Sequence, residues 1–131
     1  GGYTQTIFGP GVGVPTRVSM YLSTSDPYAR IWTPPGSARA PLAAQVGSAV
    51  ITGAWNTTEA YAYANGVQGT QRADGTGTLG DGSGTTYVGS EAANWFNGNI
   101  YAIIGYNAVH TIAQRQAIER ALGAVFGISV A

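Results

Sequence analysis

Apolar and polar residues alternate along short stretches of the N-terminal half, which predicts β-strands. Residues 17–22 have one apolar face, and residues 28–32 alternate in the same way after a turn-forming Ser-Thr-Ser-Asp-Pro. We expect these two stretches to pair as a hairpin. Residues 3–8 predict a further strand, whereas residues 33–41, with three prolines and no period, predict an irregular surface loop.

The middle of the chain carries the clearest local signal, that of a β-hairpin. Residues 59–64 and 67–71 have the pattern of strands, and Asn65 and Gly66 join them. Both residue types tolerate a positive φ, which a two-residue type I′ turn requires at its two central positions. Residues 47–55 predict another strand, whose glycines indicate a bulge or a close backbone approach.

The C-terminal half predicts a loop, two strands and the turn between them. Five glycines make residues 73–85 a loop by composition, and residues 86–89 follow as a short strand. The aromatic and amide-rich residues 94–98 predict a turn. They lead into a strand expected over residues 99–106.

An amphipathic helix is expected over about residues 111–126. Thr111 and Gln114 have the spacing of a capping box, and Gly127 can take the left-handed conformation that ends a helix. Apolar residues at helical spacing predict one buried stripe, made of Ile118, Ala121, Leu122, Val125 and Phe126. Polar residues are expected on the other faces, namely Arg115, Gln116, Glu119 and Arg120. One apolar cluster is expected to join Phe96, Ile100, Ile118, Leu122 and Phe126.

Composition and charge narrow the class of protein. The 131 residues suffice for one core, and 20 glycines with eight tyrosines favour strands and turns over a helical bundle. Six arginines balance six acidic residues, so we expect no nucleic acid and no anionic membrane as partner. Apolar runs are too short to span a membrane, no signal-peptide pattern is expected, and the chain has no cysteine.

The order of the C-terminal motifs resembles that of concanavalin A-like lectin/glucanase domains, in particular their laminin G-like branch. The resemblance covers about residues 47–128 and rests on YAYANGV (61–67), YVG (87–89), FNGNI (96–100) and the helix with its Phe-Gly-Ile ending. It implies an all-β fold, an antiparallel jelly-roll sandwich with one C-terminal α-helix. The whole of residues 1–131 would form this single domain.

Two departures from that family pattern bear on the organisation of the chain. A complete sandwich of this kind often exceeds about 200 residues, and the usual Trp-His segment before the hairpin is replaced by Gly53-Ala54-Trp55-Asn56. We therefore expect contracted N-terminal strands, or a domain that is the C-terminal part of a longer chain. A truncated sheet would leave edges that favour partners.

The sequence lacks the residue patterns of common catalytic and metal sites. No two acidic residues stand two positions apart, as the acidic strand of the glucanase branch requires, and no Gly-x-Ser-x-Gly elbow is present. His110 precedes the helix, where contact with solvent or with the helix start is expected. Asp74 and Asp81 lack EF-hand spacing, so a flexible loop is favoured over a calcium site. We expect that the protein is not an enzyme and that it binds no cofactor and no metal.

Exposed aromatic residues are the remaining candidates for ligand binding. Trp95 could stack on a sugar ring while Asn94 and Asn97 bond its hydroxyls, although a place in the core is the alternative for any Trp in a small β-domain. Trp32 and Trp55 fit the core more readily.

Two functions follow as hypotheses. The first is a structural component of a bacteriophage virion, such as a tail, fibre or capsid-decorating protein, because domains of this resemblance occur there. Its partners would be other virion subunits, in a homo-oligomer or a larger complex. The second is a lectin-like module that binds glycans at the virion, in the extracellular space or at a cell surface.

Overall fold

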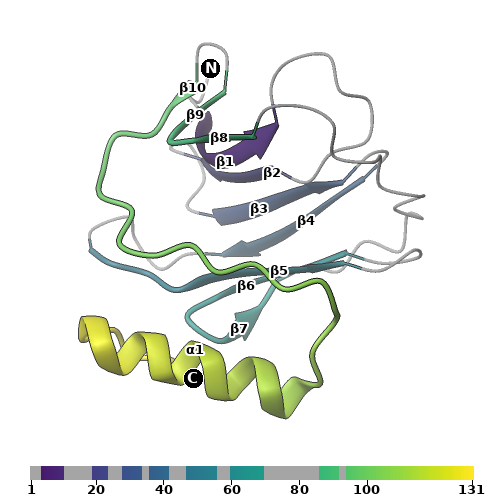
Figure 1. Ribbon diagram of the computed structural model, residues 1–131, viewed down its shortest axis with the longest axis vertical. Coiled ribbons are helices and arrows are strands. Elements are labelled where there is room, and N and C mark those ends of the chain that lie inside the picture. Colours follow the sequence, from purple (N-terminus) through teal and green to yellow (C-terminus); the bar gives the residue numbers. More distant parts are fainter. Residues whose placement is uncertain are drawn as a thin grey trace.

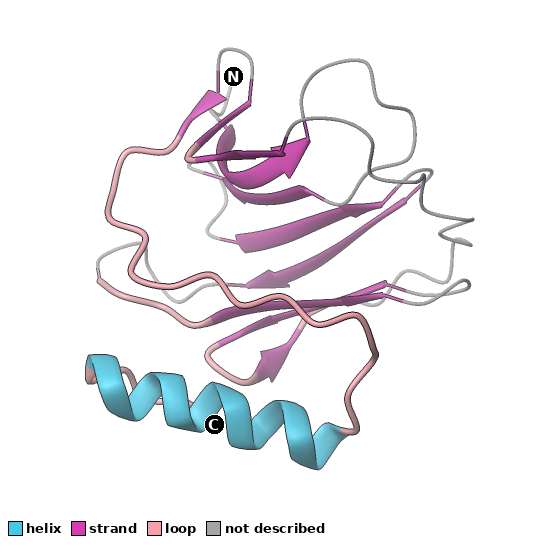
Figure 2. Cartoon of the chain, viewed as in Figure 1, coloured by secondary structure: helices cyan, strands magenta, loops and turns pink. Residues whose placement is uncertain are grey.

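The computed structural model describes residues 4–10, 19–23, 28–33, 36–41, 47–55, 60–69, 86–91 and 94–131. These residues form ten strands and one helix, arranged as two larger sheets, a two-stranded ladder and a terminal helix (Figures 1 and 2). The predicted loop 73–85 lies outside them. Among the described residues, no helix is both long and apolar enough to cross a membrane.

The larger sheet has five antiparallel strands in the order β4-β3-β2-β1-β8. Its strands are β1 (Thr4–Pro10), β2 (Ser19–Ser23), β3 (Tyr28–Thr33), β4 (Gly36–Pro41) and β8 (Thr86–Val88). Ser19 pairs with Trp32 and Ser23 with Tyr28, so the predicted pairing of β2 with β3 is confirmed. The expected strands at residues 3–8 and 86–89 are likewise present as β1 and β8.

The prediction of an irregular loop over residues 33–41 is wrong. Gly36–Pro41 forms β4, which pairs with β3 from Tyr28↔Pro41 to Thr33↔Gly36. β4 is the outermost strand of this sheet in the described residues, and Pro41 stands at its end, where a missing N–H does least harm. Strand pairing therefore overrode a proline-rich composition.

The smaller sheet consists of β5 (Ile51–Trp55), β6 (Ala60–Ala64) and β7 (Val67–Gln68). Asn65 and Gly66 join β6 to β7 with φ of 49° and 83°, which confirms the predicted turn with two positive φ angles. Ala62 and Ala64 are buried, and these small residues let β6 lie close against β3 and β4.

The prediction of a strand over residues 99–106 is wrong for this structure. After β9 (Ser90–Glu91) and β10 (Asn94–Trp95), residues 96–111 run as an irregular segment that reaches the helix start (Figure 2). Figure 1 shows this segment passing in front of the smaller sheet. The local β pattern is present, but no neighbouring strand of the described residues pairs with it.

The terminal helix α1 (Ile112–Phe126) confirms the prediction in both position and end chemistry. Thr111 Oγ1 accepts a hydrogen bond from the Gln114 N–H at 3.3 Å, and Gln114 Oε1 accepts one from the Thr111 N–H at 3.0 Å. This reciprocal pair is a capping box. Gly127 ends the helix with a φ of 66°, in the left-handed region.

The predicted buried stripe of the helix is only partly formed, because Ile118 and Leu122 are half-buried and the other three residues are exposed. Glu119 and Gly123 are its buried residues, whereas Ala121 is exposed, Val125 is 73% exposed and Phe126 38%. A Cβ at Gly123 would lie 2.5 Å from the Ile128 carbonyl oxygen. The helix therefore turns its small residue toward the chain that returns after Gly127, and this close approach sets which face is buried.

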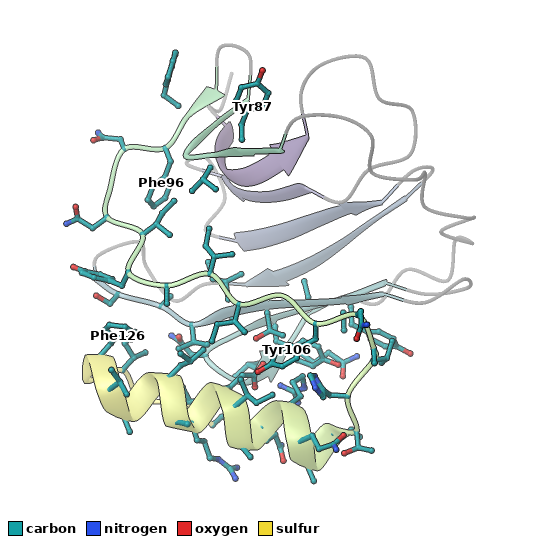
Figure 3. All side chains as sticks on the ribbon, in the orientation of Figure 1. Tyr87, Phe96, Tyr106 and Phe126 are labelled. Carbon is teal, nitrogen blue, oxygen red and sulfur yellow. The ribbon has the colours of Figure 1, made fainter. Side chains whose placement is uncertain are left out.

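The predicted five-residue apolar cluster is not formed as one unit. Figure 3 shows Phe96 beside the larger sheet and Phe126 at the C-terminal end of α1. The partner of Phe126 is Tyr101, with ring centroids 5.5 Å apart. Because residues 99–106 do not enter a sheet, they cannot bring Phe96 and the helix onto a common core. The jelly-roll arrangement of the whole chain stays a prediction.

Candidate functional site

A buried polar cluster joins the helix to the hairpin of β6 and β7. Arg115 Nη1 donates to Glu119 Oε2, one helical turn further on. The Arg115 guanidinium lies over the Tyr63 ring, with Cζ 3.7 Å from the ring centroid, which is cation–π geometry. Glu119 is 2% exposed and Tyr63 8%. The sequence predicts Arg115 and Glu119 on faces other than the buried stripe, whereas the structure buries Glu119 and half-buries Arg115.

The surroundings of Tyr63 raise the pKa of its phenol. Burial raises the pKa of the Tyr63 phenol above 10.0, the Arg115 charge opposes this rise and the Glu119 carboxylate adds to it. The phenol therefore stays neutral at physiological pH. It offers the helix an aromatic face and cannot serve as a base there.

Two buried polar atoms in this cluster, Arg115 Nε and Glu119 Oε1, have no hydrogen-bond partner among the described residues. Their charges are compensated mainly by each other, within a single helix. The described residues also contain no group of three His, Cys, Asp or Glu that could hold a metal ion. The cluster thus fits the role of an attachment point between helix and sheet.

The hairpin turn is itself fixed by its neighbours. The Asn65 N–H donates to the Val50 carbonyl oxygen at 2.8 Å, and Asn65 Oδ1 accepts from the Val50 N–H at 2.8 Å. On its other side the turn meets the C-terminal residues, where the Ala131 N–H donates to the Asn65 carbonyl oxygen at 2.9 Å. The turn therefore links β5, the hairpin and the segment that follows α1.

The predicted ligand-binding residues lie on or just after β10. Trp95 is 70% exposed and Asn97 is exposed, so both are accessible from outside the domain. Asn94 pairs with Glu91 across β9 and β10, and its side chain lies outside the described part. A sugar site built from these three residues stays a prediction.

The single histidine is placed by an aromatic neighbour. His110 lies edge-on to Tyr106, with ring centroids 4.3 Å apart and an interplanar angle of 84°. Figure 3 shows Tyr106 near the point where the irregular segment approaches the helix. Half-buried, His110 contacts this segment just before the helix cap.

The sequence predictions missed the main surface feature, because four of its six residues lie in the stretch expected to be a strand, residues 99–106. Six large apolar side chains between residues 101 and 112 are each 50% to 71% exposed. We call them the apolar strip; they are Tyr101, Ile103, Ile104, Tyr106, Val109 and Ile112. One sequence signal marks this region, since residues 92–114 contain no Asp, Glu, Lys or Arg.

Comparisons with known proteins identify no relative of this chain. No family model matches the chain, and no curated protein and no solved structure matches it either. The resemblance to concanavalin A-like domains therefore rests on the sequence motifs alone.

Proposed function

We propose that this chain is a non-enzymatic structural and binding domain that joins a larger assembly through its apolar strip. The observation that carries this proposal is the exposure of six large apolar side chains within one short segment. Single exposed apolar residues are common on protein surfaces, but contiguous apolar patches mark interaction sites. Covering the strip would remove this area from water and so stabilise an assembly.

Two further observations support an assembly role over a catalytic one. The described cluster of titratable groups is buried between helix and hairpin, where it is occupied with holding α1. The formal net charge of zero lets neutral surfaces meet without long-range repulsion. Together with the motif resemblance, these features favour a component of a bacteriophage virion whose partners are other virion subunits.

Light scattering coupled to size-exclusion chromatography tests this proposal on the purified chain. We expect masses above that of the 13.4 kDa monomer, rising with protein concentration. A monomer that persists to about 100 μM, a concentration at which even weak protein pairs associate, would contradict self-assembly through the strip.

The second candidate function is glycan binding, which the 70% exposure of Trp95 favours. An exposed Trp face can stack on the apolar face of a sugar ring. We expect a glycan array to show binding that Trp95→Ala abolishes. Tyr87→Ala is the matched control, because Tyr87 is also an exposed aromatic residue of this domain. An array without binding, or binding that survives Trp95→Ala, would contradict the glycan function.

A further inference from the structure

We propose that residues 99–106 act as an edge strand that pairs antiparallel with residues 98–105 of a second copy, about a twofold axis at Ala102. This inference rests on the proposed assembly function and names its partner. The backbone between Gly98 and His110 makes no backbone hydrogen bond to another described residue. Among the described residues, the ladder-forming groups of this segment therefore have no partner strand.

The side chains of this segment suit a β-ladder. Ile100, Tyr101, Ile103, Ile104 and Tyr106 are β-branched or aromatic residues, the types enriched in strands. Natural edge strands carry charges, above all Lys, or proline that block pairing. Residues 99–106 contain no charged residue and no proline.

The chemistry of the segment indicates a second copy as its partner. Residues 92–114, 23 in number, contain no Asp, Glu, Lys or Arg. A partner strand with charged side chains would lose water from those charges on pairing here and would find no opposite charge in return. The same segment of another copy is uncharged as well. Because the net charge of the chain is zero, two identical copies also approach without repulsion.

Symmetry fixes the possible registers. A twofold axis through an antiparallel ladder requires one residue to lie opposite its own copy, because hydrogen-bonded and non-hydrogen-bonded pairs alternate. With Ala102 on the axis, Tyr101 faces Ile103 and Ile100 faces Ile104 of the other copy. An aromatic residue opposite a β-branched one is a favourable cross-strand pair, and so are two β-branched residues. The small Ala102 fits opposite itself.

The contact of Tyr101 with Phe126 relates this strand to the helix, since their ring centroids are 5.5 Å apart. Tyr101 and Phe126 keep 62% and 38% of their surfaces exposed in the single chain. The exposed surface of Tyr101 is available to the second copy.

Cysteine cross-linking tests the register directly, because the natural sequence has no cysteine. Ala102→Cys places two thiols opposite each other across the axis, within the reach of a disulfide. Ile104→Cys is the matched control on the same strand, where the two thiols would be about 13 Å apart along the ladder. Val125→Cys is the control on the helix, where residue 125 is 73% exposed.

We expect Ala102→Cys to form a covalent dimer at least about tenfold faster than either control under mild oxidation. Hydrogen exchange should show the amides of residues 99–106 protected at high protein concentration and unprotected on dilution. Helical circular dichroism checks that each variant folds. Equal rates for the three variants, while the natural chain still associates, would overturn this pairing and leave the assembly function standing. A chain that is monomeric throughout would contradict both.

Discussion

Glu119 is buried on the hairpin-facing side of α1, and among the described residues its carboxylate pairs with Arg115. A buried ion pair adds little net stability, because desolvation of two charges offsets their attraction. Removal of one partner is costly, since it leaves the other charge buried without compensation. The stacking of Arg115 on Tyr63 ties this balance to the hairpin.

Glu119→Ala should therefore lower the free energy of unfolding by about 3 kcal/mol, the lower end of the range for breaking a buried pair. The lower end is expected because Arg115 is 11% exposed and can still reach some water. Urea unfolding followed by helical circular dichroism measures the change. Arg115→Met combined with Glu119→Leu is the control, and it should recover most of the loss. A single variant as stable as the natural chain would show that the pair is not buried as described.

The raised pKa of Tyr63 predicts a dependence of stability on pH. Because the folded chain holds the phenol proton more tightly than the unfolded chain, this contribution is complete below the unfolded pKa of 10.0. It is lost as the pH rises through the folded pKa. We expect the unfolding free energy to fall between about pH 9 and pH 11 by more in the natural chain than in Tyr63→Phe. Parallel curves for the two proteins would exclude a special environment for Tyr63.

At the level of elements, the contacts of α1 depend on a missing side chain. Gly123 lies against the segment that returns after the helix, and the Ile128 N–H donates to the Gly123 carbonyl oxygen at 2.8 Å. A Cβ at Gly123 would also lie 2.7 Å from Val130 Cγ2. Those distances are shorter than van der Waals contact, so an added methyl group must displace the backbone of the returning segment.

Gly123→Ala should accordingly destabilise the protein by about 1–3 kcal/mol, as overpacking does. The sign of this stability change is informative, because alanine in an exposed helix interior stabilises a protein by roughly 1 kcal/mol relative to glycine. Gly105→Ala is the control, since nothing lies within 4 Å of a Cβ at that position. Thermal unfolding measures both changes, and Gly105→Ala, outside the helix, reports the effect of a methyl group added in open space. A stabilised Gly123→Ala protein would mean that the returning segment does not contact the helix.

The same elements show how far the sequence predicts this structure. The Asn65-Gly66 turn and the Thr111 capping box were predictable because each depends on residues at most three positions apart. Strand β4 was missed because pairing with β3, a tertiary contact, outweighed local composition. The segment over residues 99–106 has a strand pattern but no partner strand among the described residues.

The buried face of α1 and the site residues were harder to predict for a similar reason. Arg115 and Glu119 have the spacing of a solvent-exposed helical pair, and no local signal shows that Arg115 stacks on Tyr63 or that Glu119 is buried. The exposure of Trp95 was foreseen only as one of two alternatives. The apolar strip was missed because most of its residues have the pattern of a strand, and a buried strand differs from an exposed one only in its tertiary surroundings.

For the whole molecule, the central claim is that the apolar strip holds copies or partners together. The uncharged region over residues 92–114 contains the segment whose backbone has no hydrogen bond to another described residue, and the net charge of the whole chain is zero. Each of these features lowers the barrier to association, and together they identify one contact surface. Substitutions on that surface should change association and leave the helix intact.

The measurement that tests this claim most directly is sedimentation equilibrium of the natural chain, Ile103→Lys and Val125→Lys over a wide concentration range. Both substitutions put a lysine at an exposed apolar position, and Ile103 belongs to the strip whereas Val125 lies on α1. We predict that Ile103→Lys weakens association at least about tenfold, because two lysines would be brought together near the axis. Val125→Lys should associate as the natural chain does. Equal association of all three proteins, or association lost only in Val125→Lys, would contradict the claim.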